Sequence, residues 1–186
     1  ASHYKRQRGI DPFTFPALFA QRIATVVAET ETTLDDLALA SAKAYANANR
    51  NPLAHMHTVE MPFELARVAS KRNPNFLSNE ALSPWLRISD CSQVSDGASA
   101  LILASEAGLA KLDRKREDTI EVLACAVRCA PLQVDADPVM LTNMQLAAQH
   151  AYATADVRAE QVDIAEVHDC FTVAEILSYE ALGFAQ

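Results

Sequence analysis

Residues 162–183 constrain the fold most, because a strand-like pattern changes there directly into a helical one. Apolar residues alternate with acidic ones as far as Val167, which is typical of a half-buried strand. Helical spacing follows: Thr172 and Glu175 fit a capping box at its start, and Gly183 stands where a left-handed residue ends a helix. The sequence therefore predicts a strand, a turn and a helix in succession.

The predicted turn contains three adjacent polar or reactive residues, His168, Asp169 and Cys170. In an open α/β sheet, ligands bind at the carboxyl ends of strands, and a helix N-terminus adds unpaired amides and the positive end of a dipole. The three residues are therefore candidates for a functional site. A structural interpretation stays open beside this one, with a packed histidine, a helix-start charge and a cysteine acting as a small hydrophobe.

The rest of the chain alternates between helical patterns and short apolar runs. Helices are expected at residues 17–28, 34–49, 105–115 and 140–151, the second of them with Thr33 as its N-cap. Buried strands are expected at residues 97–104, 120–129 and 162–167, in one sheet. Residues 52–84 lack a period, so a loop region with a functional use is expected there. This order of elements predicts an α/β fold.

Composition excludes several classes of protein. Half of the residues are hydrophobic, which is enough for a core, and the formal net charge of -8 argues against general nucleic-acid binding. The four cysteines form no CxxC pair and indicate reduced thiols, with Cys125 and Cys129 expected in the core. No apolar run is long enough to span a bilayer. His55 and His57 have no acid or cysteine at metal-ligand spacing, so no metal site is expected.

Two motifs carry a resemblance to a known family. His168-Asp169-Cys170-Phe171 resembles the His-Asp-Cys-Phe motif of sterol-carrier-protein type thiolases, and the helical pattern after it fits as well. Residues 90–100, reading DCSQVSDGASA, resemble the segment that opens the carboxyl-terminal half of the thiolase fold. Weaker similarities at residues 14–19 and 51–54 keep the family's order. The resemblance covers nearly the whole chain.

The resemblance implies a layered α-β-α thiolase fold, with a loop-domain region at residues 1–84 and the first part of the carboxyl-terminal α/β domain at residues 85–186. It implies an acyl-CoA C-acyltransferase that cleaves 3-ketoacyl-CoA thiolytically or runs the reverse Claisen condensation. His168 would donate to the thioester or enolate oxygen, and Cys170 would transfer a proton. Ser92 would contact the pantetheine arm of CoA, and Phe171 would line the acyl pocket.

The resemblance also sets expectations for partners. Acyl-CoA and CoA are the expected ligands, with the CoA thioester as substrate and no permanently bound cofactor. A homodimer or homotetramer is expected, inside the cell in a peroxisome-type organelle or a mitochondrion, although no targeting signal is visible. The family's nucleophilic cysteine and its Gly-His-Pro and Cys-x-Gly motifs are not among the 186 residues, so the middle of a longer enzyme is expected, inactive by itself.

Two other functions remain open at this point. One is a non-catalytic, thiolase-like protein that binds acyl-CoA or another protein. The other is a cysteine hydrolase built around Cys170, whose thiolate a helix N-terminus would favour. A partner histidine one helical turn away and an oxyanion loop are not visible for such a hydrolase.

Overall fold

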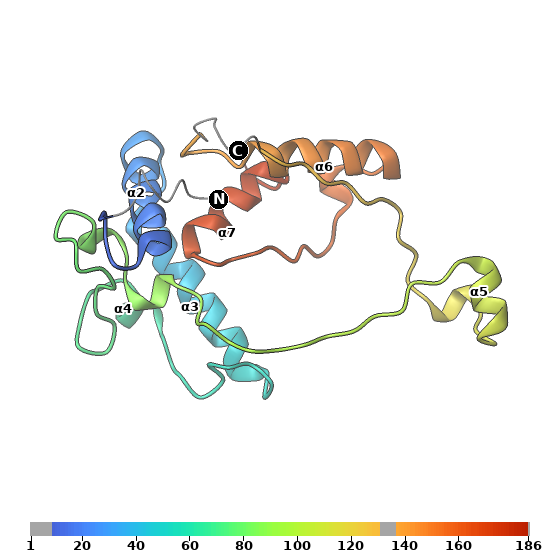
Figure 1. Ribbon diagram of the computed structural model, residues 1–186, viewed down its shortest axis with the longest axis horizontal. Helices are drawn as coiled ribbons and strands as arrows, with labels where there is room; N and C mark the ends of the chain where they lie inside the picture. Colours follow the sequence, from blue (N-terminus) through green and yellow to red (C-terminus); the bar gives the residue numbers. More distant parts are fainter. Residues whose placement is uncertain (1–8, 131–136, 186) are drawn as a thin grey trace.

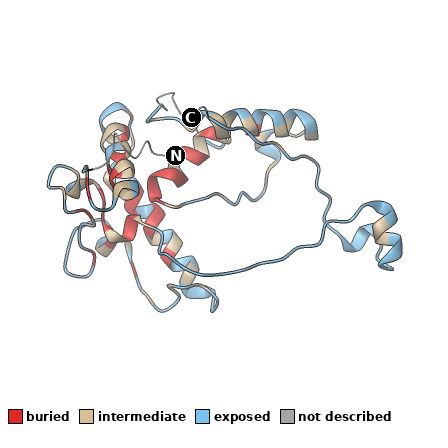
Figure 2. Ribbon diagram, in the orientation of Figure 1, coloured by how far each residue is buried: buried red, intermediate tan, exposed pale blue. Residues whose placement is uncertain are grey.

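The structure is a computed structural model that describes residues 9–130 and 137–185. Its buried residues concentrate where helices α2 (Thr14–Glu29), α3 (Leu34–Arg50) and α7 (Thr172–Ala181) meet, with the short α4 (Phe63–Ala66) beside them (Figures 1 and 2). Helix α6 (Thr142–Ala155) packs against α7, and α5 (Glu106–Lys111) lies at the far end of a long excursion (Figure 1). Four 3-10 turns complete the elements: η1 (Ser83–Trp85), η2 (Ile88–Asp90), η3 (Arg116–Asp118) and η4 (Ala159–Gln161).

Helix α3 begins as its sequence predicts. The Thr33 hydroxyl accepts from the Asp36 amide at 3.3 Å, and the Asp36 carboxylate accepts from the Thr33 amide at 2.8 Å. This capping box satisfies two amides that a helix start otherwise leaves unpaired. The predicted helices over residues 17–28, 34–49, 105–115 and 140–151 are confirmed as α2, α3, α5 and α6, with bounds that differ by a few residues.

The main core joins α2, α3 and α7 to the segment around Leu86. Ile23, Leu37 and Leu177 are almost fully buried within it. Phe19 from α2 stacks on Phe171 with ring centroids 4.1 Å apart. These contacts join residues far apart in sequence, so burial of apolar side chains holds α2, α3 and α7 together. Each large side chain buried there contributes roughly 1.5–3 kcal/mol to stability.

Helix α7 follows the prediction at its end and departs from it at its start. Gly183 adopts φ +80 after the last turn, the left-handed conformation that glycine accepts most readily. The N-cap, however, is Phe171, without a side-chain cap, so the predicted capping box of Thr172 and Glu175 is wrong. The Thr172 hydroxyl donates instead to Asp90, and the Glu175 carboxylate pairs with Lys43.

Residues 97–104, 120–129 and 162–167 run extended and largely exposed, and no strand is formed within residues 9–130 and 137–185. The only β-pairing described there is two isolated antiparallel bridges, Asn75 with Arg87 and Cys91 with Phe171. A helix satisfies its own backbone hydrogen bonds, whereas a strand needs a neighbour. The predicted α/β layering is therefore not confirmed and stays a prediction, as does the domain division at residues 84 and 85.

Cys125 and Cys129 lie in the second of these extended segments and are exposed, so their predicted place in the core is wrong. The prediction failed because it assumed a sheet around them. The described helices include none that is long and apolar enough to cross a membrane.

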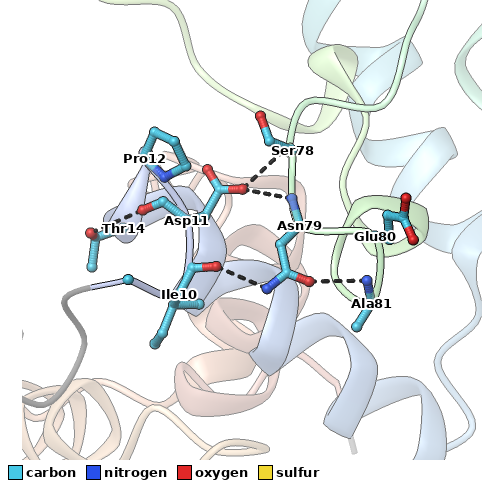
Figure 3. A pocket seen from close by; sticks show the side chains of 9 residues that line it. Ile10, Asp11, Pro12, Thr14, Ser78, Asn79, Glu80 and Ala81 are labelled. Carbon is cyan, nitrogen blue, oxygen red and sulfur yellow. Dashed lines mark hydrogen bonds between the residues drawn. The ribbon is translucent and has the colours of Figure 1, made fainter.

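The amino-terminal segment is held by one buried carboxylate. Asp11 accepts hydrogen bonds from the amides of Phe13, Ser78 and Asn79, each at 2.9 Å, beside an open cavity of about 810 Å³ (Figure 3). Asn79 adds a side-chain bond to the carbonyl of Ile10 at 2.8 Å (Figure 3). These bonds fix the start of α2 against the loop at residues 78–81.

Candidate functional site

The structure brings the two sequence motifs together. Cys91 and Phe171 form an antiparallel bridge, and the Ser92 amide donates to the carbonyl of Cys170 at 3.0 Å. The segment that starts at Asp90 therefore runs alongside the segment that leads into α7. Residues that the sequence separates widely thus meet at one place, which we call the motif junction: residues 90–92 and 170–172.

A buried ion pair supports the motif junction. Asp90 is 2% exposed, and its carboxylate accepts from the Arg87 amide at 2.9 Å and from the Arg87 guanidinium at 2.8 and 3.1 Å. The same carboxylate accepts from the Thr172 hydroxyl at 3.2 Å. Arg87 also donates to the carbonyl of Leu34 at 3.4 Å, at the start of α3. Because a buried charge without partners is costly, this complete pairing is what permits Asp90 to lie inside the protein.

A cavity of about 140 Å³ lies beside the motif junction. Its lining combines mostly small residues of α3 with residues of both motifs. The lining residues are Ala40, Ser41, Ala44, Tyr45, Ala48, Met56, Ser89, Asp90, Cys91, Ser92, Gln93, Asp169, Thr172 and Glu175. The cavity therefore combines an apolar wall with several hydrogen-bonding groups, which is the usual composition of a small-molecule site.

Glu175 on α7 contributes a paired carboxylate to the cavity. It is 3% exposed and accepts hydrogen bonds from Lys43 of α3 and from the Tyr179 hydroxyl. Lys43 also donates to Tyr179 at 2.8 Å, and the pKa of Lys43 is raised, because these two partners outweigh the opposing effect of burial. The three side chains join α3 to α7 at the cavity and keep the Glu175 charge compensated.

Both thiols of the motif junction are held in the protonated form. Burial, followed by the nearby Asp90 charge, raises the pKa of Cys91 to about 12. Burial also raises the pKa of Cys170, with Asp169 adding to that effect and backbone amides opposing it. Neither thiol therefore has the depressed pKa of an activated nucleophile.

The residues singled out from sequence lie differently around this site. Ser92 and Asp169 line the cavity. Cys170 is half-buried against the core, and Phe171, 4% exposed, packs with Phe19 and is not among the residues that line the cavity. His168 is exposed and is not a lining residue either.

Several residues that shape the site lie outside the motifs and were not singled out from sequence. Tyr45 and Ala44 of α3 form the apolar wall, and Lys43 compensates Glu175. Only Arg87 had a visible signal, an arginine three residues before an aspartate. Ala44 and Tyr45 line the cavity because α3 packs against α7, which is far away in sequence. No local sequence pattern predicts that contact.

Comparison with known proteins identifies the family. The family model for thiolase C-terminal domain-like sequences matches residues 126–186, which include α6 and α7. The acetyl-CoA acetyltransferase of Methanocaldococcus jannaschii is 32% identical over 175 residues, covering 93% of this chain and 42% of that protein. The chain belongs to the thiolase superfamily.

Other relatives of this thiolase-superfamily chain have different names. The benzoylsuccinyl-CoA thiolase subunit BbsB of Thauera aromatica is 29% identical over 166 residues, covering 89% of this chain and 40% of that protein. Human sterol carrier protein 2 is 31% identical over 134 residues, covering 69% of this chain and 24% of that protein. The chain thus spans less than half the length of each of these relatives.

Proposed function

We propose that the protein acts as a thiolase-type acyl-CoA C-acyltransferase, with its CoA thioester bound at the motif junction. The observation that carries the proposal is the meeting of the two motif segments through the Ser92 amide and the Cys170 carbonyl, beside one cavity. Names of relatives such as acetyl-CoA acetyltransferase and benzoylsuccinyl-CoA thiolase agree with this reaction type. The reaction is thiolytic cleavage of a 3-ketoacyl-CoA or the reverse condensation.

Each motif residue has a proposed role in that reaction. His168 donates a hydrogen bond to the thioester or enolate oxygen, where an exposed imidazole next to the cavity-lining Asp169 can be reached by substrate. Cys170 transfers a proton, which its protonated thiol can supply. Ser92 contacts the pantetheine arm, and Phe171 supports the acyl pocket through its stack with Phe19.

The proposal also covers the ligands, the oligomeric state and the cellular compartment of the protein. Acyl-CoA and CoA are the partners, no permanent cofactor takes part, and the working form is a homodimer or homotetramer. A peroxisome-type organelle or a mitochondrion is the proposed compartment.

The alternative function is binding of acyl-CoA without turnover. It is favoured by one observation, that burial keeps the thiols of Cys91 and Cys170 protonated, so the motif junction offers no activated thiolate. For the same reason we expect the 186-residue chain by itself to show no acetyl exchange between acetyl-CoA and CoA.

A matched pair of variants on α3 tests the proposed site. Ala44 lines the cavity, whereas Ala46 of the same helix is exposed. Ala44→Phe should fill the cavity and weaken CoA binding at least tenfold in isothermal titration calorimetry, and Ala46→Phe should leave it unchanged. Equal affinity in both variants would mean that CoA binds elsewhere. Acetyl exchange by the complete protein then separates an enzyme from a protein that only binds.

A further inference from the structure

The motif junction keeps one antiparallel register over three successive residue pairs. Asp90 lies opposite Thr172, Cys91 bridges Phe171, and the Ser92 amide donates to Cys170. The bridge between Cys91 and Phe171 and the flanking bond from Ser92 to Cys170 involve the backbone, which fits any sequence. The first pair uses side chains, with the Thr172 hydroxyl 3.2 Å from the Asp90 carboxylate, so it depends on the residues present.

Register decides which residues of the two motif segments lie opposite each other. A slip by one residue would change every pair across the junction. Ser92, which lines the cavity, would then lose Cys170 as its partner. A pairing only three residues long resists such a slip weakly, because few hydrogen bonds define it.

Asp90 and Thr172 are placed to prevent that slip. Both oxygens of Asp90 are held by Arg87, and Arg87 is held in turn by the carbonyl of Leu34, so the carboxylate has a fixed orientation. Thr172 is 7% exposed and is the first residue of α7, so it moves with that helix. Its hydroxyl serves Asp90, while the N-terminus of α7 has no side-chain cap. Thr172 follows the N-cap residue Phe171, and its hydroxyl ties α7 to the other motif instead of capping the helix.

We propose that Asp90 and Thr172 are positioning residues that lock the register of the motif junction and thereby place Ser92 and the His168–Cys170 turn relative to each other. Asp90 and Thr172 act through the residues beside them. The lock itself follows from geometry alone, whereas its effect on CoA binding rests on the proposed function.

Hydrogen exchange of the Ser92 amide measures the lock directly, because this amide donates across the junction. In the full 186-residue chain, Thr172→Val removes the hydroxyl and keeps the branched shape, so we expect the Ser92 amide to exchange about tenfold faster, as for loss of a hydrogen bond to a charged group. Thr172→Ser keeps the hydroxyl and should remain within about twofold of the unaltered chain. Rescue by serine distinguishes the hydrogen bond from simple packing.

Ser178→Ala is the matched control. Ser178 is also buried on α7, and among the described residues its hydroxyl bonds only to the Ala174 carbonyl of the same helix, at 2.6 Å. The Ser178→Ala substitution therefore removes a buried hydroxyl from α7 without changing the motif junction, so the exchange rate of the Ser92 amide should stay unchanged. The proposal is overturned if Thr172→Val leaves Ser92 exchange unchanged, or if Ser178→Ala accelerates it equally.

CoA titration of the same variants separates the two proposals. If CoA binds, Thr172→Val should weaken binding about tenfold and Thr172→Ser should restore it. If Thr172→Val binds CoA with unchanged affinity although its Ser92 amide exchanges faster, the lock does not position Ser92 for CoA binding. If none of the chains binds CoA, the proposed function fails, while the exchange measurements still decide whether the lock exists.

Discussion

Cys91 is the residue whose chemistry the structure changes most. With the pKa of its thiol raised to about 12, the thiolate fraction at pH 8 is roughly a thousandfold below that of an ordinary cysteine. We therefore expect iodoacetamide at pH 8 to alkylate the exposed Cys125 and Cys129 well before Cys91. Peptide mass spectrometry over a time course gives the order, and early alkylation of Cys91 in the folded chain would contradict its protonated state.

His168 carries the prediction closest to catalysis. Its exposure means that replacement should leave packing intact, so His168→Ala should not shift the melting temperature. In the complete enzyme, turnover should fall roughly a hundred- to a thousandfold, as for loss of one oxyanion donor. His168→Asn should recover part of it, since an amide is also a donor. A packed histidine would give the opposite result, with a lower melting temperature and unchanged specific activity.

Residue roles were predictable only where one residue dictates its own conformation. Gly183 was found because a positive φ has a clear sequence signal. Thr172 was misassigned because a threonine hydroxyl can either accept from a backbone amide at a helix start or donate to a distant acceptor, here Asp90. Sequence shows the first role and hides the second.

At the level of single elements, the capping box of α3 makes a measurable contribution. Thr33→Ala should lower the free energy of unfolding by about 1 kcal/mol, because the Asp36 amide loses the hydroxyl that accepts its hydrogen bond. Thr32→Ala is the control. The hydrogen bond of Thr32 runs from its backbone amide to the Thr30 hydroxyl, and this substitution keeps that amide. Urea denaturation of both variants gives the comparison, and equal losses would exclude a specific capping effect.

Asp11 ties the start of α2 to the loop at residues 78–81 and should make stability depend on pH. Burial opposes its ionisation, but three backbone amides outweigh burial and leave the pKa of Asp11 below its ordinary value. A lowered folded pKa stabilises the protein above the unfolded value near 4, and this contribution is lost as pH falls through the folded pKa.

Asp11→Asn tests that dependence. Unfolding by urea at pH 6 should show a loss of stability on the order of 1 kcal/mol, and the difference from the unaltered chain should shrink at pH 3. Asp96→Asn, at an exposed position, should show no such convergence. A difference that stays constant from pH 6 to pH 3 would mean that the Asp11 charge is unimportant.

Helices were predictable as elements, whereas the predicted strands were not found. The period of Leu37, Ala38 and Ser41 indicates both the helix and its buried face. Residues 97–104 have the composition of a buried strand, but composition does not show which segment would pair with that strand. In the described structure Leu101, Ile102 and Leu103 are exposed. The cavity was unpredictable for a related reason, since it forms only where α3 packs against α7.

For the molecule as a whole, burial divides the chain into a packed body and an exposed excursion (Figure 2). Trypsin should therefore cut first around α5 and η3, after residues such as Lys111, Arg114 and Arg116, where few contacts resist local opening. Arg22 and Lys43, on the packed helices, should be cut later. Mass spectrometry of early fragments checks the order, and early cleavage inside α2 or α3 would contradict this division.

The motif junction also has a consequence for the order of folding. Asp90 and Thr172 are 82 residues apart, and closing a flexible chain over that span costs on the order of 4 kcal/mol of entropy. Helices α3 and α4 are close in sequence and pack together, so they can form and pair before that cost is met. Helix α7 should therefore dock late, after the folding transition state. Changes at the junction should then leave the refolding rate nearly unchanged and accelerate unfolding, so that the site is the first part of the body to open.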